Sequence, residues 1–313
     1  YMNNEQKISI VAPLFNEAQS VAALHGELLA VLKPLSRPFE IILVDDGATD
    51  GTFEEIKKLP FVTGIRLSRN YGQTLALAAG IKKATGDIIV TIDGDLENDP
   101  KDIPNLLKKL DEGYDIVSGW RKDRWQGQFF TRRLPSYIAN KIISFVTGTE
   151  LHDHGCSLKA YRKEILRDLT LFGEMHRMIA AYAKLLNGAK VAELPVNYKP
   201  RQFGVSKYGP FRIFRVLLDL FALYFFYRYS NRPIHFFGGI GFFSFFLSFL
   251  SFLTMFYFKY VLNITFIETP LPIMVTLFAI IGMQFVLMGL LAEFILRQSV
   301  DSRQYLIKEE VVN

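Results

Sequence analysis

The sequence predicts an α/β domain, in which helices cover both faces of a β-sheet, followed by two membrane-spanning helices. Up to about Tyr229, short apolar stretches typical of buried strands alternate with helical patterns, and this alternation at close spacing indicates parallel strands. Beyond that residue lie two apolar runs, both longer than the roughly 20 residues that a helix needs to cross a bilayer. The mean hydropathy of +0.18 is high for a soluble protein, and these runs carry the excess.

The predicted elements follow one another without long gaps. The first strand, ISIVAP, ends at Pro13, and a helical pattern runs from Glu17 to about Leu32. The second strand, FEIILVDD, ends at Asp45 and Asp46. The remaining elements are a short helix at 54–59, a strand at 62–68, a helix at 70–86 and a strand at 87–95. The helix at 70–86 begins with a turn and ends at Gly86, a residue type that favours helix termini.

Three of these strands end in polar loops. In parallel sheets with helices on both faces, ligands bind beyond the carboxyl ends of the strands. One such loop alone could be a solvated strand end, but three on the same edge indicate a single site. The residues are Asn16 and Glu17, Asp45 and Asp46, and Asp93 and Asp95.

The acidic cluster Asp93-Gly94-Asp95 indicates a metal-bound diphosphate. Like charges repel, and burying them costs free energy unless something positive neutralises them. No G-x-G-x-x-G follows the first strand and no G-x-x-x-x-G-K-[ST] occurs, which argues against a nicotinamide site and a P-loop. An EF-hand is excluded, because Asn98 and Pro104 stand where it requires Gly and Glu. Two carboxylates, completed by phosphate oxygens and water, suit Mg²⁺ or Mn²⁺.

Four segments, APLFNE, LVDDGATDGT, LSRNYGQTLALAAGIKKATGD and TIDGDLENDP, resemble the family 2 glycosyltransferases of the GT-A fold. More narrowly, they resemble polyprenyl-phosphate sugar transferases of the dolichol-phosphate mannose synthase and bactoprenol glucosyltransferase type. The resemblance implies a Rossmann-like mixed sheet. It also implies that the nucleotide-sugar contacts Pro13, Asn16, Glu17, Asp45, Asp46, Asp93 and Gly94.

The same resemblance implies a metal site and a catalytic group. The metal ligands would be Asp93, Asp95 and Glu97, although the family usually has Gln at the position of Glu97. Asp95 and Asp153 would be the catalytic residues, with Asp153 acting either as a base or to position substrate. His152 and His154 flank Asp153, so a His-Asp-His metal site is an alternative interpretation.

Basic residues farther along the chain resemble the family's contacts to the lipid phosphate. A guanidinium fork suits a phosphate better than an ammonium group does. The alternative is an ordinary solvated basic helix in the segment TRRLPSYIANK. The candidates are Arg121, Arg132, Ser136, Arg201, Ser206 and Lys207.

The predicted organisation has four parts. A catalytic domain at 1–205 precedes amphipathic juxtamembrane helices at 206–231, two membrane helices with a short external loop at 232–298, and a tail at 299–313. A buried hairpin of a soluble protein is the alternative for 232–298. Basic residues flank both apolar runs, so the positive-inside rule places their outer ends and the catalytic domain in the cytoplasm. The single cysteine, Cys156, fits a reducing compartment, and we expect no signal peptide.

The expected function is inverting transfer of a sugar from a nucleotide-sugar to a polyprenyl phosphate in a bacterial or archaeal cell membrane. UDP-glucose is the first expectation for the donor, and GDP-mannose, UDP-GlcNAc or a UDP-aminoarabinose derivative are the alternatives. A processive polysaccharide synthase is disfavoured because no Q-x-x-R-W occurs, and a non-catalytic membrane adaptor is disfavoured by the full set of acidic strand ends. The expected partners are a nucleotide-sugar donor, a lipid acceptor and the membrane, and no nucleic acid is expected. Whether the chain forms a homo-oligomer is left open.

Overall fold

The structure is a computed structural model that describes residues 6–122, 137, 140–141, 143–144, 147–167, 175–199, 218, 221–222, 224–225, 228–229 and 232–298. The chain divides into two compact units, Tyr1–Tyr224 and Phe225–Asn313. The first contains the predicted sheet, and the second contains two long helices. The four-part division at 205, 231 and 298 stays a prediction, because most of 206–231 and all of 299–313 lie outside the described residues.

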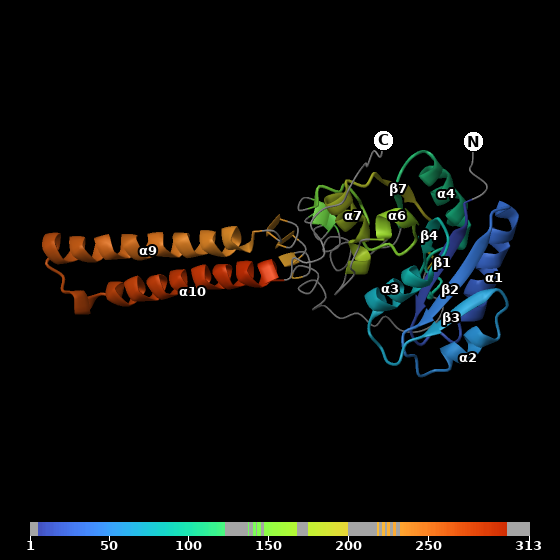
Figure 1. Cartoon of the computed structure of the whole chain (residues 1–313), viewed down its shortest axis with the longest axis horizontal. Helices are drawn as coiled ribbons and strands as arrows, with labels where there is room; N and C mark the ends of the chain where they lie inside the picture. The colour runs from blue at the N-terminus through green and yellow to red at the C-terminus, as the bar shows by residue number, and fades with distance from the viewer. Residues whose placement is uncertain are drawn as a thin grey trace. The chain divides into compact units, whose positions relative to one another are not determined.

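A seven-stranded mixed sheet forms the centre of the first unit, with the strand order β3-β2-β1-β4-β6-β5-β7 (Figure 1). Four neighbouring strands, β3, β2, β1 and β4, are parallel, whereas β6 runs antiparallel between β4 and β5. The strands are β1 (Ile8–Leu14), β2 (Phe39–Asp45), β3 (Val62–Arg66), β4 (Ile88–Thr91), β5 (Ile116–Trp120), β6 (Lys159–Arg162) and β7 (Val191–Pro195). The sheet confirms the predicted mixed α/β class.

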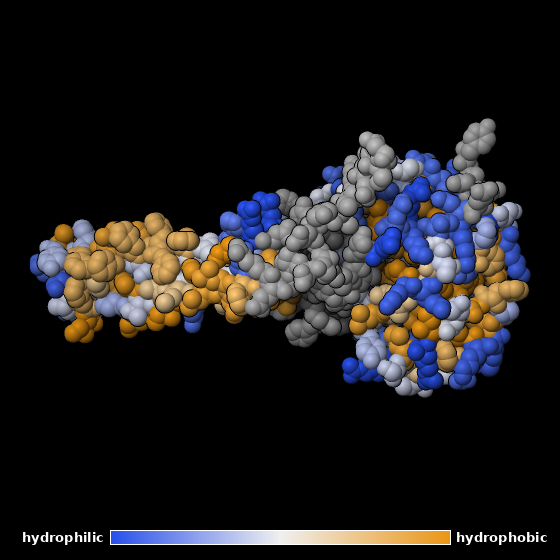
Figure 2. All heavy atoms as spheres, in the orientation of Figure 1, coloured by the Kyte–Doolittle hydropathy of each residue, from blue (hydrophilic) through white to orange (hydrophobic). Residues whose placement is uncertain are grey.

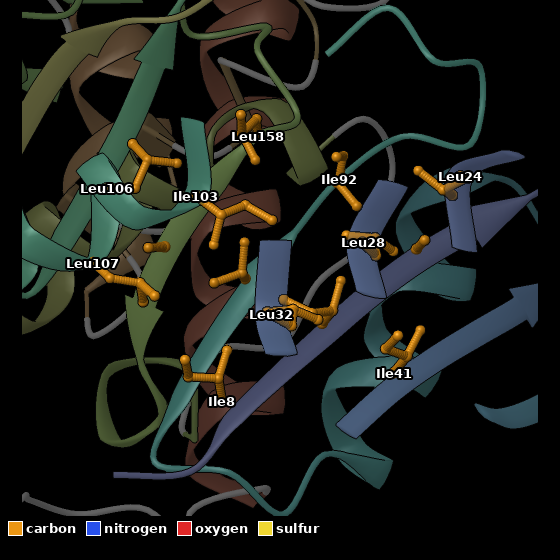
Figure 3. Packing of buried hydrophobic residues seen from close by; sticks show 14 of the residues in the cluster. Ile8, Leu24, Leu28, Leu32, Ile41, Ile92, Ile103, Leu106, Leu107 and Leu158 are labelled. Atoms are coloured by element: carbon orange, nitrogen blue, oxygen red, sulfur yellow. The ribbon is translucent and has the colours of Figure 1, made fainter. Parts of the chain in front are cut away.

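Helices cover both faces of this sheet. They are α1 (Val21–Leu32), α2 (Thr52–Lys57), α3 (Gln73–Lys83), α4 (Ile103–Asp111), α6 (Lys163–Leu166) and α7 (Ile179–Asn187), with 3₁₀ turns η1 (Lys33–Leu35), η2 (Pro100–Asp102) and η4 (Met175–Arg177). Alternate strand residues point to opposite faces, so Ile41 belongs to the core cluster that includes residues of α1 and α4, whereas Ile42 belongs to the cluster that includes residues of α3 and α7. Figure 3 shows the first of these cores, where Leu28 and Ile103 meet the sheet.

Two predicted helix boundaries were wrong, for local reasons. The first helix begins at Val21 rather than Glu17, because residues 17–20 form a turn in which the Ser20 N–H donates to the Glu17 carbonyl at 3.1 Å. The helix expected at 70–86 is α3, Gln73–Lys83. The turn predicted to open it, at residues 70–72, is held by the carboxylate of Asp46, which follows β2, but the helix ends at Lys83 rather than at Gly86, because Ala84 has an extended backbone. The first of these two differences lies at the sheet edge that carries the predicted site.

The second unit contains α9 (Pro233–Val261) and α10 (Leu271–Gln298), with a 3₁₀ turn, η5 (Phe266–Glu268), between them. Both are long and apolar enough to cross a membrane. They pack against each other through small residues: the hydroxyls of Ser244 and Ser248 donate to carbonyls of α10 at 2.7 and 2.8 Å. Large hydrophobic residues cover the outside, as Figure 2 shows for one face. This exposure favours lipid around the helices over the alternative of a buried soluble hairpin.

Candidate active site

The three predicted polar strand ends lie at one edge of the sheet. Strands β2, β1 and β4 are parallel neighbours, and Leu14 at the end of β1 pairs with Asp45 at the end of β2. The Asp46 N–H donates to the Leu14 carbonyl at 2.8 Å. Because the three strands point the same way, their carboxyl ends bring the loops after Leu14, Asp45 and Thr91 together.

The loop after β1 is tied to the loop after β2. Asn16 has a positive φ of 55°, and its side-chain oxygen accepts a hydrogen bond from the Thr49 N–H at 2.9 Å. The Glu17 N–H donates to the Thr52 hydroxyl at 2.9 Å, and its carboxylate accepts from the Ser20 hydroxyl at 2.9 Å. Asn16 and Glu17, both predicted to contact the nucleotide, therefore also join the two loops that would bind it. Pro13 lies within β1, opposite Val44.

Asp45 and Asp46 have different surroundings. Asp45 is fully buried, accepts from the Ala48 N–H at 2.7 Å and lies 3.4 Å from Nε of Arg66. Both oxygens of Asp46 accept backbone N–H groups, from Tyr71 at 2.8 Å and from Gly72 at 2.9 Å. Burial raises the pKa of Asp46, and these two hydrogen bonds oppose that shift. Asp46 thus holds the turn before α3, which explains why that helix begins at Gln73.

The Asp93-Gly94-Asp95 turn follows β4 directly. A side chain at Gly94 would clash with Leu14, since an added Cβ would lie 2.1 Å from its Cδ2. Asp93 accepts from Nε2 of Gln73 at 2.6 Å, and Asp95, which is 8% exposed, accepts from the Glu97 N–H at 3.1 Å. Burial and then the charge of Asp95 raise the pKa of Asp93 to about 6. A cation would relieve this repulsion.

The three predicted metal ligands do not form a complete cage of their own. Among the described residues, no group of three or more His, Cys, Asp or Glu side chains is arranged to hold a metal ion. Asp93 and Asp95 nevertheless fit a Mg²⁺ or Mn²⁺ ion that takes its remaining ligands from phosphate and water. Glu97 is partly exposed, and its carbonyl accepts from the Lys199 N–H at 2.9 Å.

The antiparallel strand β6 brings a later loop beside this turn. The Ser157 carbonyl accepts from the Thr91 hydroxyl at 2.6 Å, and the Ser157 hydroxyl accepts from Nδ2 of Asn98 at 2.9 Å. The Ser157 side chain also hydrogen-bonds to Asp93. Gln73 and Ser157 could not be predicted as neighbours of the acidic turn, because segments distant in sequence bring them to it.

Arg121 and Asp153, predicted separately, form an ion pair. Arg121 donates from Nε to one Asp153 oxygen at 2.8 Å and from a terminal nitrogen to the other at 3.1 Å. The Gly155 N–H donates to the same carboxylate at 3.0 Å. Burial opposes the charge of Arg121, but Asp153 raises the pKa of Arg121 above its usual value. The other candidates for the acceptor phosphate, Arg132, Ser136, Arg201, Ser206 and Lys207, lie outside the described residues.

The His-Asp-His metal site is not formed. His152 directs Nδ1 to Glu193 at 2.7 Å, whereas buried His154 directs Nε2 to the Ser144 hydroxyl at 3.1 Å. Burial, and then the charge of Lys159, lower the pKa of His154 to about 3. The two imidazoles therefore have separate structural partners on either side of Asp153.

Comparisons with known proteins agree with this geometry. Residues 9–170 match the family described as glycosyl transferase family 2. The chain is 42% identical over 298 residues to a dodecaprenyl-phosphate galacturonate synthase of Rhizobium johnstonii, covering 93% of this chain and 88% of the relative. It is 35% identical over 307 residues to an undecaprenyl-phosphate 4-deoxy-4-formamido-L-arabinose transferase of an Enterobacter species, covering 95% and 90%.

Solved structures share the fold at low sequence identity. Glucosyl-3-phosphoglycerate synthase of Mycobacterium tuberculosis, in complex with phosphoglyceric acid, matches with a TM-score of 0.54 and 19% identity, covering 71% of this chain and 80% of that one. A mannosyltransferase of Pyrobaculum calidifontis, in complex with GDP-mannose and Mn²⁺, matches with a TM-score of 0.51 and 20% identity, covering 71% and 64%.

Proposed function

The chain belongs to glycosyl transferase family 2, and from this premise we propose that it transfers a sugar from a nucleotide-sugar to a polyprenyl phosphate. The observation that carries the proposal is the extent of the similarity to the galacturonate synthase. The similarity, at 42% identity, covers 93% of the chain. It therefore extends into both the sheet unit and the helix pair. Both curated relatives are named for a polyprenyl-phosphate product or acceptor.

The relatives change the proposed sugar. UDP-glucose was the first expectation from the sequence, but the relatives are named for galacturonate and for 4-deoxy-4-formamido-L-arabinose. They favour the alternative of another sugar on the same lipid. We place galacturonate first and an aminoarabinose derivative second, with uridine diphosphate as the proposed carrier.

The chemistry of the acceptor determines what the protein must do. A phosphate monoester has a second pKa near 6, so its oxygen is mostly ionised at pH 7 and needs little help from a base. That oxygen forms a bond to the anomeric carbon, while the bond from this carbon to the diphosphate oxygen breaks, which inverts the configuration. Asp153, paired with Arg121 through both of its oxygens, then orients groups at the acceptor side rather than removing a proton.

The donor side is proposed to use the loops after β1, β2 and β4. Asp93 and Asp95 would hold a divalent cation, and this ion, when bound, neutralises charge on the leaving diphosphate. Gln73 and Ser157 keep Asp93 in place through its carboxylate. Asn16 and Asp45 order the two loops that would contact the nucleoside.

With two apolar helices of membrane-spanning length, the chain is a membrane protein. We propose that the sheet unit lies on the cytoplasmic side, where nucleotide-sugars are made. The positive-inside rule supports this orientation, since Arg228 and Arg232 precede α9 and Arg297 follows most of α10. The proposed acceptor would then present its phosphate at the same membrane face.

The test is transfer by the full chain, purified in detergent, to undecaprenyl phosphate. Radiolabelled UDP-galacturonate, UDP-4-deoxy-4-formamido-L-arabinose, UDP-glucose, UDP-GlcNAc and GDP-mannose are supplied one at a time with Mg²⁺ or Mn²⁺. We expect label to enter the organic phase with one of the first two donors. Hydrolysis of a donor without labelled lipid would contradict the proposed acceptor, and strong transfer of glucose would contradict the proposed sugar.

A further inference from the structure

Asp153 lies in a loop whose backbone is held by one buried carboxylate, that of Glu193 in β7. The Glu193 oxygens accept from the His152 N–H at 2.9 and 3.1 Å and from the Asp153 N–H at 3.0 Å. They also accept from Nδ1 of the His152 ring at 2.7 Å. The Glu193 side chain is 11% exposed, whereas the His152 side chain is 66% exposed, so water reaches the His152 ring more easily than the carboxylate.

Every partner of Glu193 in this cluster is a donor, which makes a carboxylate the fitting group. An ionised carboxylate only accepts hydrogen bonds, whereas an amide also presents an NH₂ group. In a Gln at this position, the NH₂ would face an N–H donor in at least one place. Hydrogen bonds to a charged acceptor are roughly twice as strong as those between neutral groups.

The sheet places a second support on the same face. Ser118 in β5 pairs with Glu193 in β7, and Trp120, two residues after Ser118, shares its face because side chains alternate along a strand. The Trp120 ring stacks on the His152 ring, with centroids 4.3 Å apart and planes 19° apart. The Trp120 ring thus stacks on one face of the His152 imidazole, and the Glu193 carboxylate accepts a hydrogen bond from its Nδ1.

We propose that Glu193 is a positioning residue, which fixes the backbone at Asp153 so that its carboxylate meets Arg121. The inference rests on the proposed function, in which Asp153 acts at the acceptor side. Arg121 and the Gly155 N–H fix the Asp153 side chain, but neither fixes its main chain. Misplacing a reacting group by about 1 Å can cost a hundredfold in rate.

The first experiment is a double-mutant cycle on the full chain, with UDP-galacturonate and undecaprenyl phosphate as substrates. Glu193→Gln should lower turnover at least about tenfold while the affinity for UDP with Mn²⁺ stays within twofold. In an Asp153→Asn background, the same change should cost less than about twofold, because it acts through Asp153. Equal losses in both backgrounds, or unchanged turnover in the single variant, would overturn the proposal.

A matched control separates positioning from general stability. Glu40 in β2 also gathers donors from distant segments, Lys7, Ser9 and Thr85, but it lies at the opposite end of the parallel strands. Glu40→Gln should lower the melting temperature and leave turnover unchanged. If Glu193→Gln does not fold, Glu193→Asp keeps the charge but draws the carboxylate back from the backbone N–H groups of His152 and Asp153 by one methylene. It should lower turnover severalfold, and unchanged turnover in that variant would overturn the proposal.

A second readout does not need the transfer reaction. The chain has two tryptophans, so a Trp125→Phe background leaves Trp120 as the only one, and its emission reports the stacked His152. Glu193→Gln should change this emission, and Glu40→Gln should not. Identical emission in the Glu193 variant and its parent would overturn the inference. Absence of transfer by the wild type with all donors would instead overturn the proposed function, while the fluorescence result would still stand.

Discussion

Nε2 of Gln73 donates a hydrogen bond to Oδ1 of Asp93 at 2.6 Å, joining the first turn of α3 to the acidic turn after β4. The two residues are distant in sequence but adjacent in space, because α3 returns the chain to the same sheet edge. The amide keeps one Asp93 oxygen in a defined place while its pKa is raised to about 6 by burial and by Asp95. The residues around this contact can be tested by substitution, as can Glu40 at the start of β2.

Gln73→Ala should weaken metal-dependent nucleotide binding. Loss of a hydrogen bond to a charged group costs about 1.5–3 kcal/mol, which is roughly a 10- to 100-fold change. Gln73→Glu should be worse, since a second carboxylate would lie against Asp93. Calorimetry with UDP in the presence and absence of Mn²⁺ measures the effect. Equal UDP affinity in all three proteins would show that Gln73 does not order the acidic turn.

Asp95→Asn should abolish most transfer, as should EDTA with the wild type. The ion that Asp95 is proposed to hold contributes several kcal/mol of charge stabilisation, so we expect a loss of about a hundredfold or more. Asp87→Asn is the matched control, because Asp87 precedes β4 at its other end, where its carboxylate accepts from the Lys7 N–H at 3.0 Å. Full activity in EDTA would refute the assignment of the metal site.

Glu97→Gln should keep substantial activity and change the metal preference. This substitution gives the residue that the family usually has at this position, and it removes one negative charge beside Asp95. We expect the ratio of the transfer rate in Mn²⁺ to the transfer rate in Mg²⁺ to differ between Glu97→Gln and the wild type. An inactive Glu97→Gln protein would mean that the Glu97 charge has a role that the family pattern does not supply.

Arg121→Lys should raise the KM for the lipid acceptor and lower turnover about tenfold, with little change in UDP affinity. Lysine keeps the charge but cannot form both bonds to Asp153. Arg37→Lys is the control, since Arg37 forms a buried pair with Asp111 at 2.7 Å away from the acidic turn. If UDP affinity falls as much as acceptor use, Arg121 belongs to the donor diphosphate.

Glu40 should make stability depend on pH in the acid range. Burial alone would raise the pKa of Glu40, but hydrogen bonds from Ser9, Thr85 and Lys7 hold it at about 2, below the usual 4.5. Its contribution to stability is therefore complete above about pH 4.5 and is lost as the pH falls from there towards 2. The difference in melting temperature between wild type and Glu40→Gln should be larger at pH 6 than at pH 3.5. A constant difference would contradict the shifted pKa.

The gathering of the acidic strand ends could be predicted from the sequence, whereas the ion pair of Arg121 with Asp153 could not. Asp45, Asp46, Asp93 and Asp95 follow strands directly, so the carboxyl-end rule for parallel sheets places them together without knowledge of the strand order. The ion pair of Arg121 with Asp153 could not be predicted in this way, because β6 enters the sheet antiparallel between β4 and β5. The turn that opens α3 was predicted, but the sequence pattern could not show that Asp46, a residue expected to bind nucleotide, holds this turn through the N–H groups of Tyr71 and Gly72.

The late arrival of β6 has a consequence for synthesis on the ribosome. Ile88 in β4 pairs with Arg162 in β6, so one edge of β4 has no partner until that later segment has emerged. The parallel half, β1 to β4, can assemble earlier from segments close in sequence, whereas the half bearing Asp153 requires pairing between strands farther apart in sequence, which is slower. A nascent chain arrested at residue 150 would present the open edge of β4 to other chains and would risk edge-to-edge aggregation.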